Sequence, residues 1–157
     1  MPPAQNDSLT NGDEATRIKR LSALVDTHFP QVHEGARITI EALPPLGARV
    51  RLHEDPRSIR PGGTVSGPAM FKLADFGVWA AIIAHLGTAG IESVTTSLTI
   101  NFLRRPAPGD LIGDVQLLKV GRRLAVADVR IWRDDPASPL AHATATYAIP
   151  PEERPER

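Results

Sequence analysis

The spacing of apolar and polar residues predicts a short helix and a β-hairpin in the first part of the chain. Residues 15–29 carry apolar side chains at helical spacing, which predicts one amphipathic surface helix. These apolar residues are Ile18, Leu21, Leu24 and Val25. Residues 36–43 and 47–53 alternate apolar and polar positions around the turn PPLG, which predicts a hairpin. Residues 54–63 are rich in proline, glycine and charge, and are predicted to be a loop.

From Ser93 onward the pattern has a period of two residues and predicts four further strands. The alternating segments are residues 93–103, 110–120, 122–132 and 140–149. Their connections read RRPAPG, GR and DDPASP, and such short connections predict an antiparallel meander of consecutive strands. In the first of the four, a set of apolar residues is expected on one face, the core side. These are Val94, Leu98, Ile100 and Phe102.

The segment between these two regions is predicted to be one long buried helix. Pro68 suits the first helical position and Gly87 suits the position just past the end, so the helix would measure about 28 Å. Apart from Lys72, Asp75 and His85 the segment is apolar or small on every side, which is typical of a buried helix or of a membrane span. The charges in its first half and the polar strands around it favour burial. The sequence therefore predicts an α+β domain in which an antiparallel sheet wraps around one helix.

Length and composition bound the class of protein. The chain has 157 residues, of which 41% are hydrophobic, which fits one globular domain. We expect a flexible polar tail over residues 1–12, a single domain over 13–150 and a charged tail over 151–157. Eighteen basic and 18 acidic residues cancel, so no nucleic-acid or membrane partner is expected. The first residues do not resemble a secretory signal, and we expect a cytoplasmic protein.

Composition also limits the chemistry. The chain has no cysteine, which excludes disulfides, thiolate catalysis and cysteine-ligated metals. Its histidines show no HExxH-like spacing, and no glycine-rich phosphate loop of the nucleotide-binding type occurs. We therefore expect neither a metal nor a cofactor.

The predicted long helix carries two groups with catalytic potential. The N–H of Gly67 points out of a helix amino terminus, where it suits a developing oxyanion. Asp75 suits a general base or a nucleophile towards an activated carbonyl. Eight residues separate the two by about 12 Å along the helix, too far to serve one carbonyl. Two antiparallel copies of the helix in a twofold dimer would bring Gly67 of one subunit to Asp75 of the other.

A structural role for Asp75 is the alternative. Lys72 lies three residues earlier, a spacing that permits an ordinary ion pair on one helix face.

At these residues the sequence resembles a known family. A buried helix that opens at Gly67, the LAD segment that ends at Asp75, and then TTSLTINFL, RPAPGD and VGRR resemble the hotdog-fold acyl-CoA thioesterases of the phenylacetyl-CoA and 4-hydroxybenzoyl-CoA branch. The resemblance covers about residues 62–150. It implies a hotdog fold, a homodimer or homotetramer, and hydrolysis of an acyl-CoA thioester at the subunit interface.

The resemblance also implies roles for individual residues. Gly67 matches the family's oxyanion glycine, and Asp75 matches its catalytic carboxylate. Thr95 matches a position where some members use a hydroxyl to hold the attacking water, although strict alternation places it opposite the apolar face. The family's usual His-Gly-Gly is replaced here by Ser66, Gly67 and Pro68. Its upstream loop asparagine has no counterpart.

Substrate contacts are expected in two regions. Ser66 and Pro68 flank Gly67 at the helix head, and arginine forks at strand ends suit the phosphates of coenzyme A. These arginines are Arg104, Arg105, Arg122 and Arg123. An apolar acyl pocket could be lined by Met70, Phe71 and Trp79, which could equally be core.

Two function classes stay open. The first is an acyl-CoA thioesterase, and the second is a non-catalytic acyl-CoA-binding protein that has lost the family's histidine together with its chemistry. A hotdog hydratase fits less well, because those sites resemble a helix-borne His or Asp-His arrangement that this helix lacks.

Overall fold

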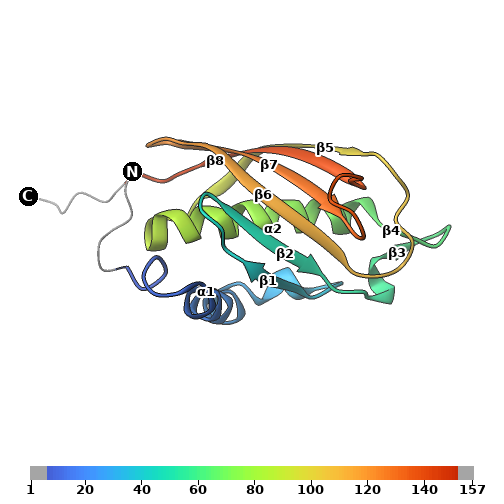
Figure 1. Ribbon diagram of the computed structural model, residues 1–157, viewed down its shortest axis with the longest axis horizontal. Coiled ribbons are helices and arrows are strands. Elements are labelled where there is room, and N and C mark those ends of the chain that lie inside the picture. The colour runs from blue at the N-terminus through green and yellow to red at the C-terminus, as the bar shows by residue number, and fades with distance from the viewer. Residues whose placement is uncertain (1–6, 152–157) are drawn as a thin grey trace, which may run out of the picture.

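The computed structural model describes residues 7–151, and within them six strands form one antiparallel sheet that curves around a long helix (Figure 1). The strand order is β1-β2-β6-β7-β8-β5. These strands are β1 (Ile38–Ala42), β2 (Gly47–Leu52), β5 (Val94–Phe102), β6 (Leu111–Val120), β7 (Leu124–Trp132) and β8 (Ala141–Ala148). The long helices are α1 (Glu14–His28) and α2 (Gly67–Leu86). This arrangement confirms the predicted α+β hotdog fold.

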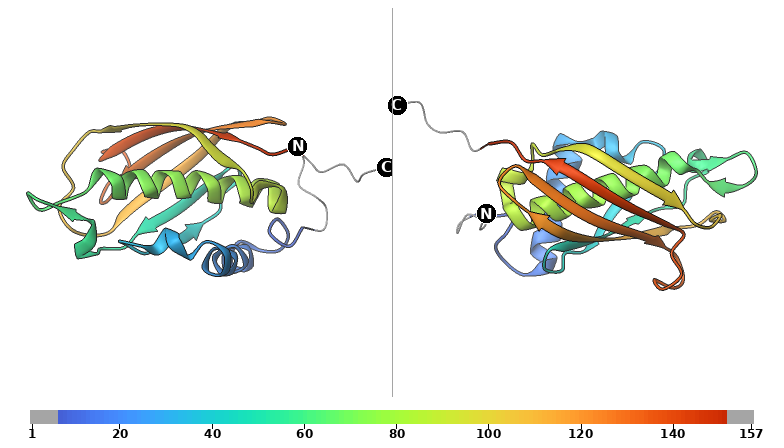
Figure 2. Two further views of the ribbon diagram at one scale, coloured as in Figure 1. Left: turned by 180° about the vertical axis from the view of Figure 1, so that it is seen from behind. Right: turned by 90° about the horizontal axis from the view of Figure 1, so that it is seen from above.

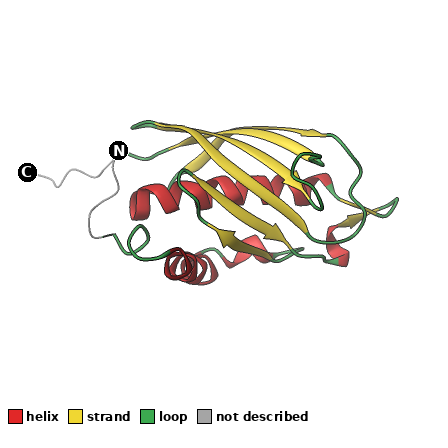
Figure 3. Ribbon diagram, viewed as in Figure 1, coloured by secondary structure: helices red, strands yellow, loops and turns green. Residues whose placement is uncertain are grey.

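Helix α2 has a defined start and end, and it packs closely against the sheet. The Ser66 side chain caps it by accepting from the Ala69 N–H at 3.3 Å, and Gly87, with a φ of 71°, terminates it. Gly77 permits close packing, since a Cβ there would lie 2.8 Å from a Val115 methyl group. Viewed from behind, α2 runs along the open side of the curved sheet (Figure 2), and colouring by element type shows strands flanking it (Figure 3).

The apolar sequence of α2 is that of a buried core helix. By length and composition alone, residues Gly67–Gly90 could cross a membrane, but most of this stretch is buried inside the protein. The core helix of a folded domain has the same composition, so the hydropathy of α2 is explained by its packing.

The order of the last four strands differs from the predicted meander. Strands β6, β7 and β8 are consecutive neighbours, whereas β5 pairs with β8 at the edge of the sheet and does not pair with β6. The segment between β5 and β6 contains Pro106 and Pro108, which do not suit a tight hairpin. It instead crosses the end of the sheet, where the Val65 N–H donates to the Pro106 carbonyl at 3.0 Å. Strand β5 is therefore a free edge.

A β-bulge in β5 changes which residues face the helix. Thr95 pairs with Tyr147 and Ser97 with Thr146, so Thr96 is an extra residue. Thr95 consequently shares the inward face with Tyr147, contrary to strict alternation. Val94 pairs with Ala148 and is 59% exposed, so its predicted place on the core face was wrong, while Leu98 and Ile100 do pack against the core.

The segment predicted to be a loop over residues 54–63 contains short regular structure. It holds the 3-10 turn η2 (Pro56–Ser58) and strand β3 (Ile59–Arg60), which pairs with β4 (Thr64–Val65). Asp55 caps η2 by accepting from the Arg57 N–H at 2.8 Å. Gly62 and Gly63 have φ values of 100° and 77° and form the turn between β3 and β4. The loop prediction was therefore wrong here, because the proline and glycine residues build turns.

The described part of the predicted amino-terminal tail contacts the end of α2. Asp7 is buried, and its carboxylate accepts from the Thr88 N–H and hydroxyl, both at 2.7 Å. Thr88 belongs to the 3-10 turn η3 (Gly87–Gly90). Residues 1–6 and 152–157 of the two predicted tails lie outside the described residues.

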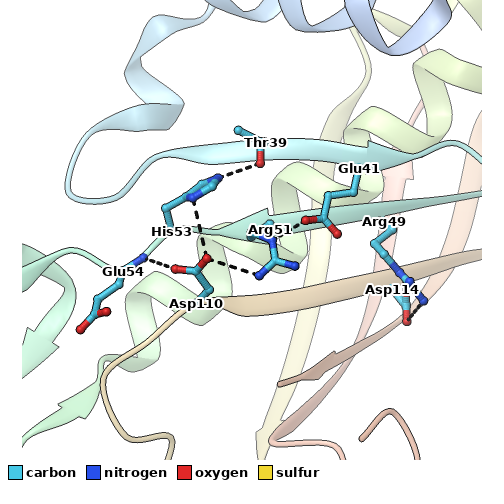
Figure 4. Close-up of polar contacts among 8 residues, drawn as sticks. All are labelled: Thr39, Glu41, Arg49, Arg51, His53, Glu54, Asp110 and Asp114. Atoms are coloured by element: carbon cyan, nitrogen blue, oxygen red, sulfur yellow. Dashed lines mark hydrogen bonds and ion pairs between the residues drawn. The ribbon is translucent and has the colours of Figure 1, made fainter. Parts of the chain in front are cut away.

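Charged pairs cover the outer face of the sheet, opposite α2. Arg49 donates to both oxygens of Asp114, at 2.7 and 3.2 Å, and ties β2 to β6. Arg51 bonds Glu41 on β1 and reaches Asp110 at 3.3 Å. Figure 4 shows this cluster, which comprises Thr39, Glu41, Arg49, Arg51, His53, Glu54, Asp110 and Asp114. These contacts lie on the face of the sheet turned away from α2 and tie the β1–β2 hairpin to β6.

Candidate active site

Asp75 lies at the meeting point of α2, β5 and β8. Its Oδ1 accepts from the Thr95 hydroxyl at 2.6 Å and from the Tyr147 phenol at 2.6 Å. The Tyr147 oxygen also lies 2.8 Å from the backbone carbonyl oxygen of Asp75. The carboxylate is therefore held by two neutral hydroxyl donors from two adjacent strands.

A chamber of about 500 Å³ opens beside this carboxylate. Its apolar walls come from α1, the 3-10 turn η1 (Pro30–His33), α2 and the segment before β5. They comprise Leu24, Phe29, Val32, Phe76, Trp79 and Ile91. Thus a carboxylate with two hydroxyls borders a chamber whose other lining is mainly apolar. The remaining polar lining residues are His28, Gln31, Lys72 and Ser93.

Trp79 is one of the aromatic walls of the chamber. Its indole N–H donates to the Ile91 carbonyl at 3.0 Å, and its ring meets Phe29 edge-on with centroids 5.7 Å apart. Of the three residues expected to line an acyl pocket, Trp79 does so. Met70 is buried in the core and Phe71 is 40% exposed, and neither borders the chamber.

Lys72 does not pair with Asp75. Its ammonium donates to the backbone carbonyls of Glu34 at 2.7 Å and Ala36 at 3.0 Å. Burial lowers the pKa of Lys72. The alternative interpretation of Asp75 as the ion-pair partner of Lys72 is therefore wrong, and the carboxylate has no structural cation on its own helix.

Gly67 begins α2, at the opposite end of β5 from Thr95. Among residues 7–151 its N–H has no acceptor, as expected for the first residue of a helix. The ring of Phe102, at the far end of β5, covers it, and a Cβ on Gly67 would lie 3.2 Å from that ring. Gly67 does not border the Asp75 chamber. Next to it, Ser66 serves as the helix cap and Pro68 is exposed in the first turn.

The four candidate arginines form two exposed pairs rather than one cluster. Arg104 and Arg105 follow the carboxyl end of β5, whereas Arg122 and Arg123 lie in the β6–β7 turn. Arg123 borders a hollow with Val94 at the other end of β5. Nine residues of strand separate these ends by about 26 Å, so one subunit does not place all four arginines on one phosphate group.

Sequence reasoning missed Tyr147. The alternation of residues 140–149 contained a signal, because the inward positions before Tyr147 are all alanine and only this one carries a polar group. The inward alanines are Ala141, Ala143 and Ala145. Its link to Asp75 depends on how β8 lies against α2, which the alternation does not show.

A family comparison agrees with this fold. Residues 62–140 match the model of the thioesterase superfamily. A comparison with curated proteins gave no match.

Solved structures provide a second comparison. A proposed thioesterase from Silicibacter sp. TM1040 is 43% identical, with a TM-score of 0.74 over 85% of this chain and 92% of that one. Zebrafish thioesterase superfamily member 2 has the same fold, with 21% identity and a TM-score of 0.73 over 89% of this chain and 100% of that one. The chain belongs to the thioesterase superfamily, and this membership supports thioester hydrolysis in general.

Proposed function

We propose that this protein is an acyl-CoA thioesterase whose Asp75 acts in a site completed by Gly67 of a second subunit. The observation that carries the proposal is the Asp75 carboxylate, which is held by two hydroxyls at the end of an apolar chamber and lacks a cation partner on its helix. A carboxylate in this setting suits a base or nucleophile beside a bound acyl group.

The edge strand supports a shared site. Thr95, which contacts Asp75, and Phe102, which covers Gly67, lie at opposite ends of β5. If two β5 edges pair antiparallel about a twofold axis, each Thr95 end meets the Phe102 end of the other subunit. The same pairing would place Gly67 of one subunit towards Asp75 of the other. It would also cover a free strand edge that ends in exposed Phe102 and Leu103.

The proposed reaction is hydrolysis of the thioester bond. The Gly67 N–H stabilises the negative charge that develops on the thioester oxygen. Asp75 either accepts a proton from the attacking water or attacks the carbonyl carbon itself to give a mixed anhydride that water then cleaves. In both routes the C–S bond breaks, the carbonyl carbon gains the water oxygen, and the thiolate leaves and is protonated.

A direct test is thiol release from a panel of acyl-CoAs, followed colorimetrically. The apolar walls of the chamber predict that apolar acyl groups turn over better than charged ones. The second candidate function, non-catalytic acyl-CoA binding, rests on Ser66 standing where the family has histidine. Saturable binding without thiol release would favour that candidate.

The arginines test whether coenzyme A is the thiol part of the substrate. Replacing the phosphate-binding arginine by glutamine should raise KM with kcat nearly unchanged, because the phosphates are bound alike in ground and transition states. The loss should shrink as salt rises, since exposed charges are screened over about 10 Å at 0.1 M. The variants to compare are those of Arg104, Arg105, Arg122 and Arg123.

A short acyl thioester without the nucleotide is the control substrate. The KM effect should be absent there. Equal effects on both substrates, or none on either, would remove these arginines from the site.

A further inference from the structure

Tyr147 occupies an unusual place for a polar side chain. It lies on the inward face of β8, only 3% exposed, in a row otherwise made of alanines. The β-bulge at Thr96 places Thr95 directly opposite it on β5. Because of this bulge, two hydroxyl side chains point at the same turn of α2.

The Tyr147 phenol contacts both the side chain and the main chain of one residue. Its oxygen lies 2.6 Å from Oδ1 and 2.8 Å from the carbonyl oxygen of Asp75. Its single proton is shared between these acceptors. Such a contact fixes the rotation of the Asp75 side chain relative to its helix.

The two hydroxyls bind only one of the two carboxylate oxygens of Asp75. Oδ1 accepts from both Thr95 and Tyr147, whereas among residues 7–151 no donor contacts Oδ2. We propose that Tyr147 is a positioning residue that, together with Thr95, holds Oδ1 and so directs Oδ2 of Asp75 to the reacting atoms. This inference rests on the proposed function for the reaction. The two hydrogen bonds to Oδ1 are, by contrast, a property of the folded chain.

Tyr147 remains a donor over the working pH range. Burial, and the neighbouring Asp75 carboxylate, raise the pKa of Tyr147 far above its ordinary value. The other titratable side chains that border the chamber are His28 from α1 and Lys72 from α2, and the Lys72 ammonium is held by backbone carbonyls. Of the three side chains His28, Lys72 and Tyr147, only Tyr147 donates a hydrogen bond to the Asp75 carboxylate.

The kinetic test compares Tyr147→Phe with wild type. Removal of the phenolic oxygen should lower kcat about 10- to 100-fold with KM nearly unchanged, since a bond to a charged group is lost while the chamber keeps its shape. In an Asp75→Asn background the same substitution should have little further effect on the residual rate.

Two threonine variants complete the design. Thr95→Val removes the second hydroxyl from an exposed strand and should also lower kcat with KM nearly unchanged. Thr96→Val is the matched control, because the neighbouring Thr96 hydroxyl donates to the Thr146 carbonyl at 3.1 Å and not to Asp75. The Thr96→Val substitution should leave kcat and KM unchanged. Thermal unfolding of each variant checks that it folds.

A measurement without substrate separates this inference from the proposed function. In full-length protein with ¹³C-labelled aspartate carboxyls, the Asp75 signal is assigned by its loss in Asp75→Asn. Its chemical shift at neutral pH should change in Tyr147→Phe and in Thr95→Val, which each remove a hydrogen bond to the carboxyl group, but not in Thr96→Val. An unchanged chemical shift in both test variants would overturn the proposed hold of the two hydroxyls on Asp75. A changed chemical shift in a protein that hydrolyses no acyl-CoA would support that hold and overturn the proposed reaction.

Discussion

Replacement of Asp75 by asparagine should lower kcat for acyl-CoA hydrolysis by about a hundred- to ten-thousandfold, the range typical of loss of a general base. The amide has the shape of the carboxylate but cannot take a proton from water or attack a carbonyl. The apolar walls of the chamber are unchanged by the substitution, so binding of the acyl-CoA should change little. Steady-state thiol release and equilibrium binding, measured on the same preparation, would separate the two effects.

Asp114→Asn is a matched control for this experiment. Asp114 lies on the outer face of the sheet, where it accepts from Arg49 at 2.7 Å (Figure 4). It also accepts from the Trp132 indole N–H at 2.7 Å. The same chemical change there should lower the unfolding midpoint but leave kcat near the wild-type value. Equal rates in Asp75→Asn and wild type would contradict any catalytic role for Asp75. Equal losses of rate in both variants would point to general damage to the fold.

The central helix could be predicted from the sequence because its signals are local. Its start near Pro68, its end at Gly87 and its uniform apolar character all lie within one segment. The positions of Gly67 and Asp75 on one helix, about 12 Å apart, followed from that prediction alone. The argument for a shared site therefore did not depend on knowing how the strands pair.

The surroundings of Asp75 could not be predicted in the same way, because they depend on pairing between distant segments. An alternation of two residues identifies a strand but not its neighbour, so β5 was placed beside β6 rather than β8. The bulge at Thr96 is likewise a feature of the β5–β8 pair and reverses the face of Thr95. The contact of Tyr147 with Asp75 likewise joins two distant segments, β8 and α2.

The shared site makes a further prediction with a large effect, which concerns mixed dimers. Light scattering should first show at least a dimer at micromolar concentration.

Gly67→Pro removes the N–H at a position where proline is compatible with a helix, and should lower kcat about a hundred- to a thousandfold, as loss of an oxyanion donor does. Gly67→Ala keeps the N–H and is its control, and its added methyl group requires the Phe102 ring to shift by a few tenths of an ångström.

A heterodimer of Gly67→Pro and Asp75→Asn subunits, purified through two different tags, should regain about half of the wild-type activity per dimer, although each parent homodimer is nearly inactive. If the sites are shared, one of its two sites combines the intact Asp75 of the first subunit with the intact Gly67 of the second, and the other site carries both defects. If each subunit instead used its own Gly67, both sites of the heterodimer would carry one defect and no activity would return. An active monomer would contradict the shared site even before this comparison, since α2 separates Gly67 from Asp75 by two turns of helix.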